Sequence, residues 1–197
     1  MAKVTSLQEQ QREFTRYRLV DSAFELFRTK GYIATTAEDI ASAVGCSRAT
    51  FYLHFKSKSA VLIEYLSRVW PSVDDAMNEF ATAVAEGMTK EDLRRRLGDQ
   101  LREWHSVAGA PTALSVARMT DPDIRLWFNS RSARSAELVA DALSTARGEP
   151  PEGHLARITL LGEMSFAAMT LEEGERKFSD NDVVDYLTDL WATLLIT

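Results

Sequence analysis

Apolar residues recur along this chain at the spacing of one helix face, and short polar breaks separate the apolar stretches. The first stretch has apolar side chains at positions i, i+3, i+4 and i+7, namely Val20, Ala23, Phe24 and Phe27. This spacing predicts one helix over residues 8–30, and the glycine that follows it, Gly31, is a typical helix stop.

The second stretch predicts a short helix that ends in a tight turn. Its apolar residues repeat the same spacing and are Ala37, Ile40, Ala41 and Val44. Thr36 is placed to cap this helix, with Asp39 three residues later as an acidic variant of the capping box. Gly45 comes directly after the apolar positions, and glycine can take the left-handed conformation that closes a helix.

A second short helix is expected directly after this turn, over residues 48–55. Ser47 can accept hydrogen bonds from its exposed amides. Phe51 and Phe55 should face inward, while the residues that point largely the other way are Ala49, Tyr52 and Leu53. Two short helices joined by a glycine-containing turn are typical of a helix-turn-helix, which lays its second helix in the major groove of DNA.

The rest of the chain shows only helical patterns. A fourth helix should begin at a cap on Ser57, and Pro71 should kink or break it, because proline removes a backbone donor and crowds the preceding turn. Further helices are expected over residues 89–108, 112–119, 123–147, 153–174 and 180–196. No strand pattern competes with them, so the sequence predicts an all-α fold.

The last two predicted helices carry unusual amounts of apolar surface. The helix over 153–174 is apolar nearly all round and should be buried on several sides. The helix over 180–196 has a regular apolar face. Together they present more apolar surface than one small domain covers, so we expect a homodimer through both helices.

Composition is that of a soluble protein, with 45% apolar residues and a mean hydropathy of −0.20. The first ten residues contain no apolar signal region, and no apolar run approaches the length of a membrane span. We therefore expect a cytoplasmic protein with no membrane partner. The single cysteine, Cys46, excludes an intrachain disulfide.

The net charge of −6 at first argues against nucleic acid, but its distribution along the chain changes that conclusion. Residues 1–58 hold nine Lys and Arg against six Asp and Glu, a balance of +3, which leaves −9 for the remainder. Such asymmetry points to a nucleic-acid-facing module attached to something else, although a segment of +3 is often only a solvated surface.

The run TTAEDIASAVGCSRATFYLHFKSKSAVL, with AFELFRTKGY before it, resembles the DNA-binding domain of the TetR family of bacterial transcriptional repressors. The resemblance covers about residues 16–66 and includes LF-x(3)-GY and S-x(2)-T-x-Y-x(2)-F in order. It implies an all-helical homodimer with two domains. Residues 1–56 would be the DNA-binding domain, and residues 57–197 would bind a small effector and dimerise.

The resemblance also assigns DNA contacts to eight residues, which are Thr36, Ser47, Arg48, Ala49, Thr50, Tyr52, His54 and Lys58. Arg48 matches a base-edge position, and Ala49 and Tyr52 match groove-facing positions. Thr36, His54 and Lys58 match phosphate contacts. The chemistry agrees, because the fork of arginine can pair with guanine O6 and N7, while hydroxyls and lysines on phosphates fix the register.

Two residues near the turn leave questions open. By the resemblance, Glu38 occupies a position for a base-reading side chain, and phosphate repels an acid there unless it accepts from a cytosine amine. Cys46 could be a redox switch, but a free cysteine mostly behaves as a small buried apolar residue.

Six residues of the C-terminal region are predicted to line an effector pocket, and these are Trp104, Met119, Trp127, Phe128, Glu163 and Phe166. Aromatic and methionine side chains supply adaptable apolar surface, although at helical spacing they are often plain core. Glu163 lies inside an apolar helix and needs a partner or a raised pKa. It could hold a polar group of an effector or pair with an arginine across the dimer.

These patterns predict a repressor that binds a near-palindromic double-stranded operator as a dimer and is released by a small apolar or amphipathic effector. A transcriptional activator or an architectural DNA binder on the same scaffold is the alternative. An enzyme has little support, because the chain has no G-x-S-x-G, P-loop or G-x-G-x-x-G motif. No cofactor is expected, and no metal, since His54 and Cys46 cannot supply the three or four ligands of zinc.

Overall fold

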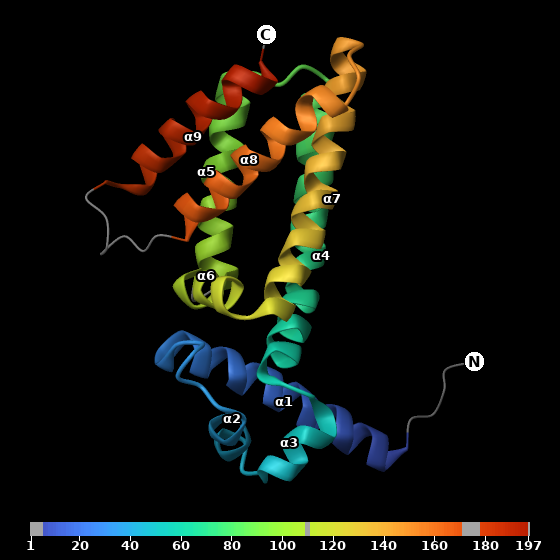
Figure 1. Ribbon diagram of the computed structural model, residues 1–197, viewed down its shortest axis with the longest axis vertical. Coiled ribbons are helices and arrows are strands. Elements are labelled where there is room, and N and C mark those ends of the chain that lie inside the picture. Colours follow the sequence, from blue (N-terminus) through green and yellow to red (C-terminus); the bar gives the residue numbers. More distant parts are fainter. Residues whose placement is uncertain (1–5, 109–110, 171–177, 197) are drawn as a thin grey trace.

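The computed structural model describes residues 6–108, 111–170 and 178–196, and within these ranges all regular structure is helical (Figure 1). The helices are α1 (Leu7–Lys30), α2 (Ala37–Ala43), α3 (Arg48–His54), α4 (Lys58–Ala85), α5 (Lys90–Ala108), α6 (Pro111–Thr120), α7 (Pro122–Arg147), α8 (Glu152–Met169) and α9 (Asp180–Leu195). The prediction of an all-α fold is confirmed.

Side-chain caps begin the helices where the sequence predicts them. Thr36 Oγ1 accepts from the backbone N of Asp39 at 3.1 Å, and the Asp39 carboxylate accepts in return from the backbone N of Thr36 at 2.8 Å. Ser47 and Ser57 cap α3 and α4. Gly45 has a φ of 73°, the left-handed conformation that glycine adopts without steric cost. The predicted capping box and helix-turn-helix turn are confirmed.

The first three helices form a head at the lower end of the molecule in Figure 1. Each contributes a nearly fully buried side chain to its core, Phe27 from α1, Ile40 from α2 and Phe51 from α3. The same core continues upward into α6 and α7 through Leu114 and Ile124. The head is therefore joined to the rest of the chain by packing as well as by the start of α4.

Helix α4 links the two ends of the molecule and runs through Pro71 as one helix. Of the kink or break expected at Pro71, the break is therefore wrong, and the kink stays a prediction. Helix α4 lies along α7, and just before the proline the buried Trp70 packs edge-on against Trp127, with ring centroids 4.7 Å apart, and against Phe128, with centroids 5.6 Å apart. This tertiary packing holds the helix together where the proline removes one backbone hydrogen bond.

The upper part consists of α4 and α7 on one side and α5, α8 and α9 on the other (Figure 1). A second core fills the space between them, and its deeply buried members include Leu93, Val139, Leu143, Ile158 and Leu187. Within the described residues, no helix combines the length and the apolar composition needed to cross a membrane.

Helix α8 differs from its prediction in two respects. It ends at Met169, where Thr170 caps it, and not at residue 174. The predicted stretch from 171 to 174 lies outside the described residues. The helix is also not buried all round, because Leu160 is 65% exposed and Met164 is 46% exposed. A single chain covers only the face of α8 that packs on α7 and α9, so the opposite apolar face stays open.

Candidate nucleic-acid interface and effector cavity

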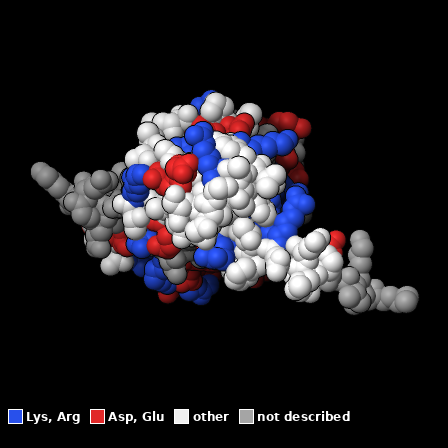
Figure 2. Space-filling view, turned by 90° about the horizontal axis from the view of Figure 1, so that it is seen from below, with Lys and Arg blue, Asp and Glu red and all other residues white. Residues whose placement is uncertain are grey.

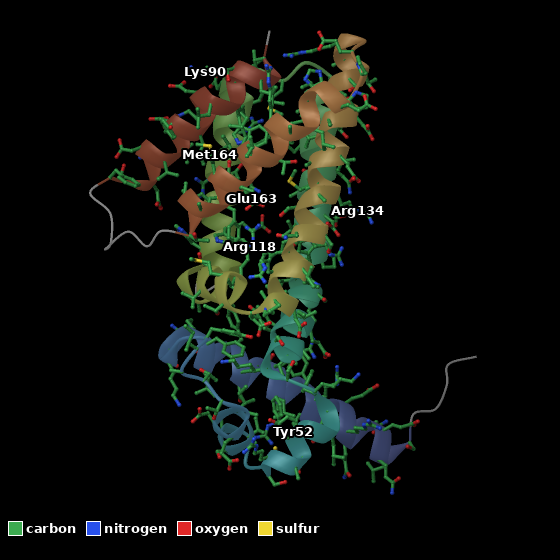
Figure 3. All side chains as sticks on the ribbon, in the orientation of Figure 1. Tyr52, Lys90, Arg118, Arg134, Glu163 and Met164 are labelled. Atoms are coloured by element: carbon green, nitrogen blue, oxygen red, sulfur yellow. The ribbon has the colours of Figure 1, made fainter. Side chains whose placement is uncertain are left out.

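Helix α3 presents one face to solvent and buries the other. Phe51 and Phe55 are buried in the head, as predicted, whereas Tyr52 is 48% exposed and Leu53 is 74% exposed. Tyr52 lies at the lower tip of the molecule, away from the helices above it (Figure 3). The exposed face of α3 is therefore free to enter a groove of DNA.

Arg48 and Tyr52 form one unit on this face. The Arg48 guanidinium lies 5.6 Å from the centroid of the Tyr52 ring. A hydrogen bond with Tyr52 and the nearby Glu38 carboxylate raise the pKa of Arg48 above its usual range. Glu38 is exposed and close enough to act on Arg48. The sequence suggested that phosphate would repel this carboxylate, but here it can orient the Arg48 guanidinium.

Three of the predicted DNA contacts are hydroxyls that also make bonds within the head, and one of them, Thr36, was predicted to bind phosphate. The Thr36 hydroxyl donates to Asp39 at 2.7 Å. The hydroxyls of Ser47 and Thr50 lie 2.9 Å apart, and Ser47 also accepts from the backbone N of Thr50. These bonds hold the start of each short helix in position, and exposed hydroxyl oxygens retain lone pairs for further contacts.

His54 is only partly exposed and carries little positive charge. Burial, with additional repulsion from Arg12 and Arg16, lowers the pKa of His54 below its usual value. Its Nδ1 is buried and has no hydrogen-bond partner among the described residues. Near neutral pH a phosphate contact from His54 would therefore come from a neutral imidazole, as a hydrogen bond and not as an ion pair.

Lys58 has a role that the sequence did not reveal. Its ammonium donates to the backbone carbonyl oxygens of Tyr32 at 2.7 Å, Thr35 at 3.1 Å and Ile33 at 3.3 Å. Burial lowers the pKa of Lys58, while Asp121 acts in the opposite direction. An ammonium has three donors, and here all three bind the loop before α2. The predicted phosphate contact would require Lys58 to leave this loop.

The head surface is not uniformly basic. Figure 2 shows the molecule from below, and on the face in view Lys and Arg side chains are interspersed with acidic ones around a largely uncharged centre. This agrees with the modest charge of residues 1–58. Recognition by such a surface depends on individual contacts more than on a strong overall field.

A cavity of about 210 Å³ lies in the upper part, between α4, α5, α7, α8 and α9. It is far larger than the roughly 10–15 Å³ that one water molecule needs. Part of its wall is a row of aromatic rings in which each ring contacts the next, with centroids 5.5–5.6 Å apart. The rings, in spatial order, are those of Trp70, Phe128, Phe166 and Trp104. This wall suits an apolar ligand.

Four of the six predicted pocket residues line this cavity, namely Trp104, Phe128, Glu163 and Phe166. Met119 and Trp127 do not. Met119 is 76% exposed on the outer side of α6, and Trp127 packs against Trp70 behind the wall. Sequence spacing alone could not separate the side of a helix that faces a cavity from the side that packs elsewhere.

Glu163 pairs with an arginine of its own chain. Arg118 on α6 donates to Glu163 on α8 at 2.7 Å, and the two side chains point toward each other between these helices (Figure 3). Arg118 also lies over the rings of Phe166, at 4.9 Å, and Phe128, at 5.7 Å. Glu163 is 41% exposed while Arg118 is 14% exposed, so the expectation of a buried carboxylate is wrong. The deeper member of the pair is the arginine.

Two polar connections of the head were missed in the sequence because their partners lie far apart along the chain. Arg16 on α1 binds Glu64 on α4, and Arg68 donates to the same carboxylate at 2.8 Å. The Tyr32 hydroxyl donates to Asp121, at the start of α7, at 2.6 Å. No helical spacing connects positions so distant, so only the fold reveals these contacts.

Comparison with known proteins places the head in a described family. Residues 19–65 match the model of bacterial regulatory proteins of the tetR family. The chain is 27% identical over 146 residues to the uncharacterized HTH-type transcriptional regulator YerO of Bacillus subtilis, a match that covers 73% of this chain and half of YerO. It is 26% identical over 182 residues to the regulator EthR of Mycobacterium tuberculosis, covering 89% of this chain and 84% of EthR.

The fold agrees with these relatives. The crystal structure of Thermus thermophilus FadR, a TetR-family transcriptional repressor in complex with lauroyl-CoA, superposes with a TM-score of 0.58 at 25% identity, covering 91% of this chain and 93% of FadR. Similarity thus extends from the helix-turn-helix through the helices around the cavity. Residues 19–65 thus match the tetR family of bacterial regulatory proteins, and the chain resembles TetR-family transcriptional regulators in sequence and fold over most of its length.

Proposed function

We propose that this protein is a transcriptional repressor that binds a near-palindromic operator as a homodimer. The exposed face of α3 carries the proposal, because it offers Arg48 and Tyr52 to solvent while Phe51 anchors the helix in the head. In a dimer, two such helices would enter successive major grooves about one helical turn, roughly 34–36 Å, apart. A repressor acting on bacterial DNA works in the cytoplasm.

Within this proposal the DNA contacts divide by chemistry. Arg48, with Ala49 and Tyr52, reads base edges. The hydroxyls at the helix starts, Thr36, Ser47 and Thr50, bind phosphates, and His54 donates to a phosphate as a neutral imidazole. Phosphate contacts set the register, and the arginine supplies discrimination between base pairs. Residues 1–56 form the reading domain, and residues 57–197 form the effector-binding and dimerisation domain.

The dimer interface is proposed on α8 and α9. Leu160 and Met164 on α8 and Tyr186 on α9 leave apolar surface exposed in the single chain. Helices α8 and α9 lie side by side on the part of the molecule opposite α4 and α7 (Figure 1). A second copy that repeats this surface would cover it through a two-fold interface.

The effector is proposed to be a small apolar or amphipathic molecule in the cavity of the upper part. The aromatic wall supports an apolar ligand, and Glu163 with its partner Arg118 offers a polar group at the wall. The T. thermophilus FadR structure contains lauroyl-CoA, which combines an apolar chain with a polar head group. Such an effector would release DNA only if it binds more tightly to a dimer whose heads no longer match the operator.

A competition experiment tests the proposal. Fluorescence anisotropy would compare DNA from upstream of the protein's own gene with shuffled DNA of the same composition. A preference of roughly 10³-fold or more, falling steeply with salt, is expected of a specific reader. Equal affinity for both duplexes would contradict the proposal. A promoter–reporter assay then separates repression, in which transcription rises when the gene is deleted, from activation.

A further inference from the structure

We propose that the hydrogen bond between Tyr32 and Asp121 is a positioning link that couples the first turn of α7 to the DNA-reading head. This inference rests on the proposed function, since it concerns how the head and the effector cavity communicate. The Asp121 carboxylate joins two parts of the molecule, the first turn of α7 and Tyr32 of the head.

Each oxygen of the Asp121 carboxylate has a different task. Oδ1 caps α7 by accepting from the backbone N of Asp123 at 3.0 Å and of Ile124 at 3.4 Å. Oδ2 accepts from the Tyr32 hydroxyl at 2.6 Å. A displacement of the first turn of α7 therefore moves the acceptor on which the Tyr32 hydroxyl depends.

Tyr32 is well suited to transmit such a displacement. Tyr32 is only 3% exposed, its ring packs against Phe27 of α1 with centroids 5.1 Å apart, and burial and the bond to Asp121 raise the pKa of its hydroxyl. Its backbone carbonyl is one of the three that Lys58 holds, and the Lys58 ammonium lies 4.4 Å from the Tyr32 ring centroid. Any shift of Tyr32 thus reaches the loop that precedes α2.

The other end of the link is the effector cavity. Phe128 lies one turn beyond Ile124 on α7 and lines the cavity, where it contacts Trp70 and Phe166. A molecule that enters against Phe128 presses on α7 directly next to the turn that Asp121 caps. Because packed side chains transmit displacement with little compression, this turn and the head move together.

A second bond reinforces the link. The Ser59 hydroxyl, in the first turn of α4, donates to Asp123 at 3.2 Å. This bond joins the start of α4 to the first turn of α7, while the Tyr32–Asp121 bond joins the head to the same turn. Together with the packing of Leu114 and Ile124 into the core of the head, the two bonds fix the orientation of the head and hence of α3.

Hydrogen exchange on the full-length protein tests the link, with Tyr32→Phe as the main variant and Tyr17→Phe, at an exposed tyrosine of α1, as the matched control. The probe is a duplex that the protein itself selects from a random-sequence library. In the wild type, this duplex should slow backbone amide exchange in two segments. One is residues 37–54, where the duplex binds, and the other is residues 123–128, at the far end of the link. Binding at one site must alter the other if the two are coupled.

In Tyr32→Phe the slowing at 123–128 should fall by roughly 10-fold or more, the factor expected for one hydrogen bond to a charged group, while the slowing at 37–54 persists. Ser59→Ala should have a smaller effect in the same direction, and Tyr17→Phe should match the wild type. Retention of the full slowing at 123–128 in Tyr32→Phe would overturn the link. Equal loss in both segments would also overturn it, because Tyr32 would then only support the fold of the head.

The free protein gives a separate reading that needs no DNA. Without any duplex, Tyr32→Phe should speed exchange at 123–128 relative to the wild type and to Tyr17→Phe, and unchanged exchange there would overturn the link. If the wild type selects no duplex, the proposed function fails, while this comparison still decides whether the head and α7 are joined. The two failures are therefore distinguishable.

Discussion

At the scale of single residues, the exposed side chains of α3 and the clamped side chain of Lys58 have opposite roles. Arg48 is held by Tyr52 and Glu38 but stays at the surface, where it can reach a base edge. Lys58 binds three backbone carbonyls of the loop before α2. Arg48 should therefore determine which DNA sequence is bound, and Lys58 should determine the stability of the head.

Arg48→Ala should remove discrimination at one base pair of the operator, a loss of about 1–3 kcal/mol, because the guanidinium no longer pairs with a base edge. Anisotropy titrations on the operator and on its single-base-pair variants would measure this. The Arg48→Ala protein should then bind the duplex that is changed at the contacted base pair with the same affinity as the unchanged operator. A uniform loss across all duplexes would instead identify Arg48 as a phosphate contact.

Lys58→Met should lower the free energy of unfolding by about 1–3 kcal/mol, because the carbonyls of the loop lose their donor while the aliphatic stem is kept. Urea unfolding would measure the change. Lys56→Met, two residues earlier at an exposed lysine, is the control and should leave stability nearly unchanged. If Lys58→Met keeps wild-type stability yet weakens binding to every duplex, the phosphate contact predicted from the sequence is correct.

At the scale of helices, α1 and α4 are joined by one carboxylate between two arginines. Burial alone would raise the pKa of Glu64, but hydrogen bonds and charge from Arg16 and Arg68 outweigh it and hold this pKa below its usual value. Arg16 also donates to the backbone carbonyl of His54 at 2.6 Å and lies 4.1 Å from the centroid of the Phe55 ring. The network fastens the end of α3 to the two helices behind it.

Because the pKa of Glu64 is lower in the folded than in the unfolded protein, its contribution is complete above the unfolded value of 4.5 and is lost as the pH falls through the folded value. Glu64→Gln should therefore cost about 1 kcal/mol at pH 7, and the difference from the wild type should shrink below pH 4.5. Urea unfolding across pH measures it, with Glu79→Gln, an exposed glutamate on the same helix, as the control. A difference that does not change with pH would contradict the ion-pair explanation.

Helix positions could largely be predicted from the sequence because their signals are local. Capping by Thr36 and Ser57 and the turn at Gly45 depend on residues within one turn of each other. The continuity of α4 through Pro71 could not be predicted, because it depends on Trp70 meeting side chains more than fifty positions away. The roles of Lys58 and Tyr32 could not be predicted either, because their partners also lie far away along the chain.

The cavity could be predicted only in part, because apolar spacing does not show which face of α6 or α7 is turned toward it.

At the scale of the whole molecule, the exposed apolar face of α8 is the feature that a single chain leaves unexplained. Leu160→Arg should convert the dimer to a monomer in sedimentation experiments and weaken operator binding by roughly 100-fold or more, because the second head no longer binds as part of the same particle. Leu126→Arg is the control, since Leu126 on α7 is exposed to a similar degree, 68% against 65%. Dissociation by both variants, or by neither, would place the interface elsewhere.

The most direct test of a dimer that reads DNA with paired α3 helices is the dependence of affinity on the spacing of two half-sites. Anisotropy would compare the selected operator with a version in which about 5 bp, half a helical turn, is inserted at the centre. The proposed geometry predicts that affinity falls by roughly 100-fold, to that of a single half-site, because the two heads can no longer reach both grooves. Unchanged affinity after the insertion would contradict it.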